Sequence, residues 1–333
     1  MPAAFGIGAK TRQNDLDIAF QFSFFTGTSA NDGATTNLGS GNNSLNIRQA
    51  FLTFGDASWG TIKAGRDLGI FGSDAILSDM TLLGVGVSGP TTSAAGGSST
   101  LGRIGSGYMY ANWRGQISYA SPNWNGFSFT AGVMEPISNG NANATREDMG
   151  YEGKVTYDFA ANDVTGRVWL SGITQKHAAG LANTSDVNGY TSRGVDVGAK
   201  VAYQGFGLVG YYYDGRGLDS QYSSTDLIGT GGIAFGSGFK TKDSGGYVQA
   251  TFVVPTIGTK LGASWGQNSS KGTLSAVDGE ITNESWIVGA YHPLTKSLNL
   301  VAEYTNQQIE GKATAGSVKI DSDTVSLGAI MFF

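Results

Sequence analysis

Two aspartates in the longest polar segment of the chain have side chains that could act on charged solutes. Asp74 and Asp79 lie within 69–111, among isoleucine, leucine and methionine residues. A loop this long inside a compact domain usually serves a function. Carboxylates that face bases across a water-filled space set up a transverse electric field, and such charged linings govern ion selectivity in pores.

The residues that catalysis would need are sparse. An enzyme requires a nucleophile, a base and an orienting group in register. The two histidines are His177, near a predicted loop, and His292, beside Pro293, and only His292 could loosely take part in a serine–histidine pair. Cysteine is absent, which excludes disulfides and thiolate metal sites. We therefore expect that the protein is not an enzyme.

Cofactor and nucleic-acid sites also lack support. The glycine-rich stretches "GIGAK" and "GTGG" do not have the lysine and hydroxyl residue that end a phosphate loop. Asp186, Asp219 and Asp226 could hold surface calcium, but no spacing makes that specific. The net charge of −5 argues against a nucleic-acid partner. We expect no cofactor.

The composition indicates strands and turns. The chain has 333 residues, 52 of them glycine, together with 14 tyrosines and 17 phenylalanines, whereas disordered chains are poor in aromatics. No window approaches the roughly 18 consecutive apolar residues of a transmembrane helix. The start, "MPAAFGIG", lacks the features of a signal peptide, so we expect that the chain is mature or that its first residues were removed.

The dominant pattern is alternation of apolar and polar residues with period two, which predicts half-buried strands. The segment "DLDIAFQFSFF" has an apolar side made of Leu16, Ile18, Phe20, Phe22 and Phe24. The C-terminal segment ends on an apolar side made of Val325, Leu327, Ala329, Met331 and Phe333.

Fifteen strands are predicted, joined alternately by tight turns and by longer polar stretches. The predicted strands are 3–14, 15–27, 44–57, 59–68, 112–121, 124–137, 148–160, 163–176, 192–204, 205–216, 241–255, 256–268, 281–293, 296–310 and 318–333. The predicted long connections are 28–43, 69–111, 138–147, 177–191, 217–240, 269–280 and 311–317. Regular alternation of this kind favours one domain over the whole chain, 1–333.

The fold class that fits this pattern is all-β, a transmembrane antiparallel up-and-down β-barrel. Its strands have the required length, and short periplasmic turns alternate with long outer loops. Polar side chains on the inner face need water, and a barrel of about 16 strands encloses an aqueous channel, whereas a soluble sandwich has about seven strands. Bacterial barrels have even strand numbers, so we expect a first strand ahead of residue 3.

In such a barrel, segment 69–111 is expected to fold into the lumen and narrow it. Strand parity predicts that further charged side chains line the lumen. The candidate bases are Lys10, Arg12, Arg48, Lys63, Arg114, Lys154, Arg167, Lys200 and Lys260. The candidate acids are Asp17, Glu152, Asp158, Asp196 and Glu303. Arg48 and Arg66 lie in strands that alternate poorly, where a bulge could re-aim them.

Three motifs, in this order and spacing, resemble the trimeric general porins of Gram-negative outer membranes. They are "LNIRQAFLTFGDASWGTIKAGRDLG", "SDAILSDM" and "LGRIGSGYMYANW", and "ISYASPNWNGFSF" is similar to a strand–turn–strand of proteobacterial members. The resemblance implies that Arg66 and Arg103 are wall arginines of a constriction and that Asp79 is a loop acid facing them. It also implies that Phe333 is the C-terminal aromatic presented to the assembly machinery.

The sequence departs from the enteric pattern at two positions. Leu83 stands four residues after Asp79, where a second loop acid is common, and about Ala4 stands where another wall arginine is expected. Both differences weaken the transverse field that the resemblance implies.

The expected function is an outer-membrane channel for passive diffusion of small hydrophilic solutes and ions. The constriction is expected to contain Arg66, Asp74, Asp79 and Arg103. The resemblance implies a homotrimer, in contact with the lipid bilayer and lipopolysaccharide. Two alternatives remain open, a substrate-specific channel in the same barrel and a plugged barrel that acts as a surface receptor or adhesin.

Overall fold

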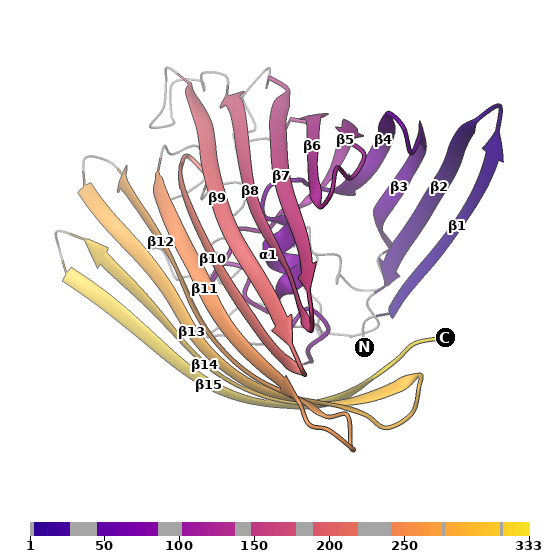
Figure 1. Cartoon of the computed structure of the whole chain (residues 1–333). Helices are drawn as coiled ribbons and strands as arrows, with labels where there is room; N and C mark the ends of the chain where they lie inside the picture. Colours follow the sequence, from indigo (N-terminus) through magenta and orange to yellow (C-terminus); the bar gives the residue numbers. More distant parts are fainter. Residues whose placement is uncertain are drawn as a thin grey trace.

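A single sheet accounts for nearly all the secondary structure of the protein. The computed structural model describes residues 3–26, 45–85, 102–136, 148–177, 189–218, 241–274, 277–313 and 316–333. In them, fifteen strands pair antiparallel, each with the next along the chain (Figure 1). This is the predicted up-and-down order, and all fifteen predicted strands are present.

The strands run from β1 to β15 without a crossover. Their bounds are β1 Ala3–Gln13, β2 Leu16–Thr26, β3 Leu45–Asp56, β4 Gly60–Leu68, β5 Trp113–Ala120, β6 Phe127–Met134, β7 Gly150–Ala161, β8 Val164–His177, β9 Tyr190–Tyr203, β10 Phe206–Arg216, β11 Lys242–Val253, β12 Lys260–Leu274, β13 Val277–Pro293, β14 Leu298–Ala313 and β15 Gly316–Met331.

The sheet curls around an interior that contains the helix α1, Ser73–Ser78 (Figure 1). The two ends of the strand order are β1 and β15, and no pairing joins them within the described residues. The predicted strand ahead of residue 3 lies outside those residues. In the part of the chain that the structure describes, no helix is long and apolar enough to cross a membrane.

The tight turn between β1 and β2 follows from its two residues. Asn14 and Asp15 both have positive φ, 48° and 61°. A two-residue hairpin turn needs positive φ at both residues, because the twist of such a turn then matches the twist of the two strands it joins. Asn and Asp tolerate positive φ better than most residues. The polar dipeptide therefore fixes the register of the first hairpin.

Two predicted long connections are wrong. Segment 269–280 is mostly strand, since β12 continues to Leu274 and β13 begins at Val277. Likewise, β14 continues to Ala313 and β15 begins at Gly316, within the predicted stretch 311–317. These strand ends consist mostly of small, hydroxyl and charged residues, so the period-two signal disappears there.

The predicted apolar sides face outward. On β15, Val325 and Leu327 are 74% and 78% exposed, whereas the intervening positions are less exposed. On β14, the polar residues Glu303, Thr305 and Gln307 are buried on the inner side. The sheet thus has an apolar outer face and a polar inner face, as a barrel in a membrane requires.

Candidate functional site: a loop held against the inner wall

The segment after β4 folds inward and follows the inner wall of the sheet. The amides of Ile70 and Phe71 donate to one carboxylate oxygen of Glu152 on β7, at 2.6 and 2.9 Å. The amide of Gly72, a residue with φ of 73°, donates to Asp196 on β9 at 3.0 Å. Wall carboxylates therefore hold the main chain where the loop begins.

Arg114 completes this first anchor. Its guanidinium lies 2.5 Å from the second carboxylate oxygen of Glu152, and both side chains are almost fully buried. It also donates to the carbonyl of Glu135. The prediction that Arg114 and Glu152 line the water path is wrong, because the inward-folded loop covers them.

Asp74 is the loop acid that meets bases of the wall. Its carboxylate lies 2.5 Å from the ammonium of Lys154 on β7 and 3.1 Å from the guanidinium of Arg167 on β8. The guanidinium of Arg167 also donates two hydrogen bonds to the carboxylate of Asp158, one to each oxygen. Burial opposes ionisation of Asp74, but the two cations outweigh it and lower the pKa of its carboxyl. The lowered pKa keeps Asp74 ionised at neutral pH.

Asp79 does not face a wall arginine. Its carboxylate is buried within the loop and accepts hydrogen bonds from the amide and hydroxyl of Thr81, from the amide of Arg103 at 3.1 Å and from the hydroxyl of Tyr108 at 2.8 Å. Burial and the nearby Asp79 carboxylate raise the pKa of Tyr108 well above its ordinary value. Asp79 therefore ties together two parts of the loop that are distant in the sequence.

Arg103 belongs to the loop and is fully buried, so the expectation of a lumen-lining wall arginine is wrong. Its guanidinium donates to Ser264 on β12 and to the hydroxyl of Ser285 on β13 at 3.0 Å. It also donates to the carbonyl of Ser106. Burial lowers the pKa of Arg103 to about 10, which still leaves it a cation at neutral pH. Arg103 fastens the second described part of the loop, residues 102–111, which we call the returning arm, to the wall.

A hydrophobic cluster fills the space between loop and wall. The loop contributes Phe71, Ala75, Ile76, Ile104, Tyr108, Met109 and Tyr110, and the wall contributes Trp169, Ile173, Tyr211, Tyr213 and Tyr247, together with Leu218. The hydroxyl of Tyr247 also donates to the carbonyl of Ala75 at 2.8 Å. These side chains are packed and buried as in a protein core, so the described parts of the loop, 69–85 and 102–111, are held firmly in the fold.

The first described part of the loop, residues 69–85, which we call the descending arm, reaches β14 at its far end. Gln249 on β11 accepts from the amide of Met80 at 2.7 Å. The amide of Val85 donates to Glu303 at 3.2 Å, and Tyr291 donates to the same carboxylate at 2.6 Å. Glu303, a predicted lumen acid, thus also serves as an anchor.

Arg48 and Arg66 are placed by strand geometry. The register between β2 and β3 shifts next to Arg48, and its guanidinium lies 3.9 Å from the ring centre of Phe25. Lys63 and Asp67 share one face of β4, and Arg66 is at an intervening position, so it lies on the opposite face. The Nε of Arg66 donates to the carbonyl of Ile47 at 3.0 Å. The structure does not bring Arg66 to Asp79.

Several other predicted bases remain accessible. Lys10 is exposed, and Arg12 pairs at 2.9 Å with Asp17. Lys63 pairs with Asp67 on β4. Lys200 lies directly opposite Arg167 across β8 and β9.

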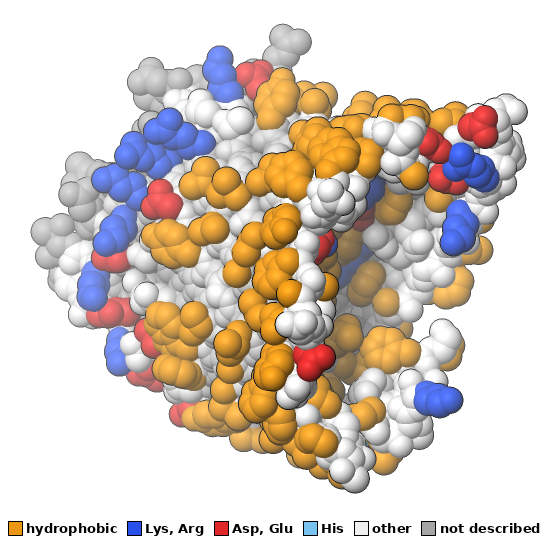
Figure 2. Space-filling view, in the orientation of Figure 1, with side chains coloured by type: hydrophobic (Ala, Val, Ile, Leu, Met, Phe, Trp, Pro, Cys, Tyr) orange, Lys and Arg blue, Asp and Glu red, His pale blue; other side chains and the backbone are white. Residues whose placement is uncertain are grey.

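Among the described residues of the loop, the exposed side chains that could meet a solute include three leucines, whereas Asp74 and Asp79 are buried. Leu77, Leu82 and Leu83 are 60%, 42% and 53% exposed. Figure 2 shows that the inner side of the sheet is hollowed. A cavity of about 250 Å³ lies between the loop and the wall and is lined by Thr61, Lys63, Asp67, Leu68, Gly69, Ile70, Ser73, Leu77, Gln116, Ser118, Ala120, Thr130 and Lys154.

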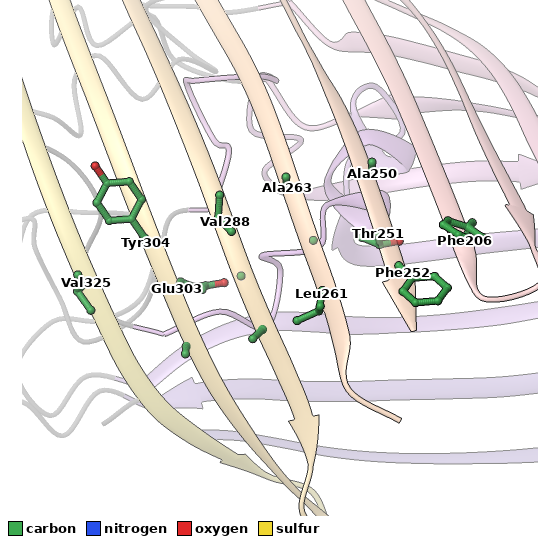
Figure 3. Close-up of a pocket in the computed structure, with 14 residues that line it drawn as sticks. Phe206, Ala250, Thr251, Phe252, Leu261, Ala263, Val288, Glu303, Tyr304 and Val325 are labelled. Atoms are coloured by element: carbon green, nitrogen blue, oxygen red, sulfur yellow. The ribbon is translucent and has the colours of Figure 1, made fainter. Parts of the chain in front are cut away.

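A larger depression of about 640 Å³ lies over β10–β15 (Figure 3). Its lining includes Phe206, Leu261, Val288 and Val325, whose side chains are exposed on the outer face. This depression belongs to the lipid-facing side and has no role in solute passage. Within the described residues, no three histidine or acidic side chains cluster as metal ligands would. The calcium candidates Asp186, Asp219 and Asp226 lie outside those residues.

Comparisons with known proteins agree with this architecture. A family model for Gram-negative porins matches residues 4–312. A search of curated proteins found no match.

Three solved structures share the fold. The outer membrane channel DcaP of Acinetobacter baumannii has 15% identity and a TM-score of 0.64, over 99% of this chain and 84% of that chain. OmpF of Salmonella typhi has 18% identity and a TM-score of 0.60, over 97% and 90%. An anion-selective porin of Comamonas acidovorans has 16% identity and a TM-score of 0.58, over 99% and 89%.

Proposed function

This chain belongs to the family of Gram-negative porins, and we propose that small hydrophilic solutes and ions diffuse passively through its barrel across the bacterial outer membrane. The observation that carries the proposal is the loop fastened along the inner wall from β7 to β14. Its described parts, 69–85 and 102–111, lie along that wall, and we propose that water fills the rest of the interior. The same loop sets the size limit for solutes.

The accessible charges of the lumen favour anions. The acids that hold the loop are buried: Asp74, Asp79, Glu152, Asp196 and Glu303. The bases that water reaches are Lys10, Arg12, Lys63, Arg167 and Lys200. Against them stand the accessible acids Asp17, Asp56 and Asp158, and the buried Asp67 that pairs with Lys63. A solute in the channel therefore meets more positive than negative charge.

A substrate-specific channel is a second candidate. The exposed Leu77, Leu82 and Leu83 give the loop an apolar surface inside a polar lumen. Such a surface would retain solutes that carry an apolar part.

We also propose that the protein is not catalytic. His177 and Ser192 lie 2.8 Å apart, as a base and nucleophile would, but both are buried. The hydroxyl of Ser192 donates to the carbonyl of Gly217 at 2.6 Å. The hydroxyl proton of Ser192, which His177 would have to remove, is thus already in a hydrogen bond. Because both side chains are buried, a substrate has no access to them.

Three copies are expected to form the working assembly. The strands β4, β5 and β6 have 9, 8 and 8 residues, whereas β12–β15 have 15 to 17. Strands of about nine to eleven residues are needed to cross the apolar core, so β4 only just reaches this length and β5 and β6 fall short of it. Contact with neighbouring copies would shield the short strands, and a structural relative, OmpT of Vibrio cholerae, is described in a trimer form.

Liposome swelling tests the proposed function. Proteoliposomes should admit neutral sugars at rates that fall smoothly with sugar size. Rapid entry of one solute class, with exclusion of equally small ones, would favour the substrate-specific channel. Liposomes that swell no faster than protein-free ones would refute both.

A further inference from the structure

The cavity between the loop and the wall has a floor of small side chains. Thr61 on β4 lies directly opposite Ala120 on β5, and Ala120 lies opposite Thr130 on β6. The next residue in this row is Lys154 on β7. Ser118, two residues before Ala120 on the same face of β5, is also small. The wall is therefore recessed beneath the loop, and this leaves the volume of about 250 Å³.

Two lysine–aspartate pairs stand on the outermost of these four strands. On β4, Lys63 pairs with Asp67. On β7, Lys154 pairs with Asp74 at 2.5 Å and donates to the hydroxyl of Ser73 at 2.9 Å. An ammonium group has three N–H donors, so within the described residues each lysine keeps at least one donor for a solute. The four charged groups add up to no net charge.

Hydroxyl groups add further hydrogen-bonding capacity between the two pairs. Thr61 and Thr130 line the cavity, and within the described part of the chain their hydroxyls form no hydrogen bond. The hydroxyl of Ser118 donates to the side-chain carbonyl of Gln116 at 3.0 Å, so its oxygen can still accept. The floor of the cavity thus offers donors and acceptors next to one another.

The opposite side of the cavity is apolar. Leu68, Ile70 and Leu77 line it, and the side chain of Leu77 is also the most exposed of the loop leucines. Because Leu77 borders both the cavity and the open interior, a solute in the lumen can enter there. Such a solute would place its polar groups against the wall and its C–H groups against the loop.

This set of groups favours a neutral solute over an ion. An anion would meet the carboxylates of Asp67 and Asp74 together with the lysines, and a cation would meet the lysines together with the acids. Either ion would add an unpaired charge to a partly buried site, which is costly. Hydroxyl groups both donate and accept, so a polyhydroxy solute can satisfy both kinds of partner. The volume lies below the roughly 300–1,000 Å³ of pockets for drug-sized ligands, so the solute is small.

We propose that this cavity is a weak binding site for a polyhydroxy solute of about the size of a monosaccharide. The inference rests on the proposed diffusion channel, because the solute reaches the cavity through the lumen. Its hydroxyls accept from the ammonium groups of Lys63 and Lys154. They also exchange hydrogen bonds with Thr61 and Thr130, while the carbon skeleton lies against Leu77. The site is open to the lumen, so it retains such a solute without excluding others.

Ion current through the wild-type protein in a planar bilayer, with D-glucose added, tests the proposal. Glucose in the cavity obstructs ions, so the current should fall by more than the change in bulk conductivity explains and should level off as the concentration rises. The reference solute is a polyethylene glycol of the same hydrodynamic size, which has ether oxygens instead of hydroxyls along its chain. It should lower the current only in proportion to bulk conductivity.

The test variant is Thr61→Val/Thr130→Val, which removes two hydroxyls and keeps the charge and the shape of the side chains. One neutral hydrogen bond contributes about fivefold to binding, so the glucose concentration for half of the effect should rise about 25-fold. The control is Thr251→Val/Thr305→Val, which removes two hydroxyls from β11 and β14, outside the cavity. It should respond to glucose as the wild type does.

Three results would overturn the proposal. The first is a wild-type current that follows bulk conductivity at every glucose concentration. The second is an equal effect of the polyethylene glycol, and the third is an equal loss of the glucose effect in the test and control variants. If the double variant does not insert, Thr130→Val should raise the half-effect concentration about fivefold, and an unchanged value there would equally refute the site.

Failure of the site is distinguishable from failure of the channel. Open, ohmic current with no specific response to glucose would refute the site and leave the diffusion channel standing. Protein that passes no current even without sugar would refute the channel, and the site with it.

Discussion

Acidic side chains inside this barrel act mainly on the protein's own loop. Glu152 and Asp196 accept from main-chain amides of the descending arm, and Asp79 accepts from an amide of the returning arm. A buried carboxylate is costly unless hydrogen bonds or a cation compensate it. Each of these acids has such partners, so each one specifies where a piece of the loop must lie.

Replacing Glu152 by Gln should weaken the first anchor severely. The change leaves the buried guanidinium of Arg114 without its counter-charge, a loss that typically costs about 3–5 kcal/mol. The free energy of unfolding in denaturant would report it. The control is Glu310→Gln, which removes a carboxylate from the half-exposed pair with Lys312 and should cost no more than about 1 kcal/mol. Equal effects of the two changes would contradict the anchor.

Replacing Lys10 by Glu should shift ion preference toward cations. Lys10 is exposed on the inner side of β1, so it acts on ions that pass. The zero-current potential in a salt gradient measures the preference, and Lys296→Glu, at a short turn, serves as control. A zero-current potential that shifts toward anion preference in the Lys10 variant, or that shifts equally in both variants, would show that Lys10 does not act on the passing ions.

Acid should loosen the contact between Asp74 and the wall. The folded-state pKa of Asp74 is lowered, so its contribution to stability is present above the unfolded value of about 3.9 and is lost as the pH falls through the folded value. We expect steady channel currents at neutral pH and added current noise only when the pH falls below the unfolded value, through the lowered folded-state pKa. Asp74→Asn should be noisy at neutral pH and less sensitive to acid. Noise that depends on pH equally in both proteins would place the titrating group elsewhere.

At the scale of elements, the strands are readable from the sequence because each alternates locally. All fifteen were predicted, with most ends within a few residues. The sequence does not predict the ends of β12 and β14, because the mostly polar residues there do not alternate with apolar ones. The bulge beside Arg48 was anticipated from poor alternation.

The course of the loop could not be predicted in the same way. Its contacts join residues far apart in the chain, as Asp74 with Lys154 and Arg103 with Ser285. No local pattern shows that Asp79 turns inward to Tyr108 instead of outward to a base. The resemblance pointed to the right segment, and only the packed structure shows which acids remain accessible to water.

At the scale of the whole molecule, the last residue is expected to matter for assembly and not for the finished pore. Phe333 is fully exposed, beyond the end of β15. Deleting it should lower the yield in the outer membrane of cells, while protein refolded in detergent should conduct as the wild type does. Normal yield in cells would contradict the role of Phe333 as an assembly signal.

The measurement that tests the central claim most directly is the conductance of the wild-type protein in a planar bilayer. A water-filled barrel narrowed by a fixed loop predicts large, steady, ohmic openings, which a trimer produces in three steps. In a salt gradient, the accessible bases predict a zero-current potential on the anion side. Protein that inserts into the bilayer and passes no current would contradict the account.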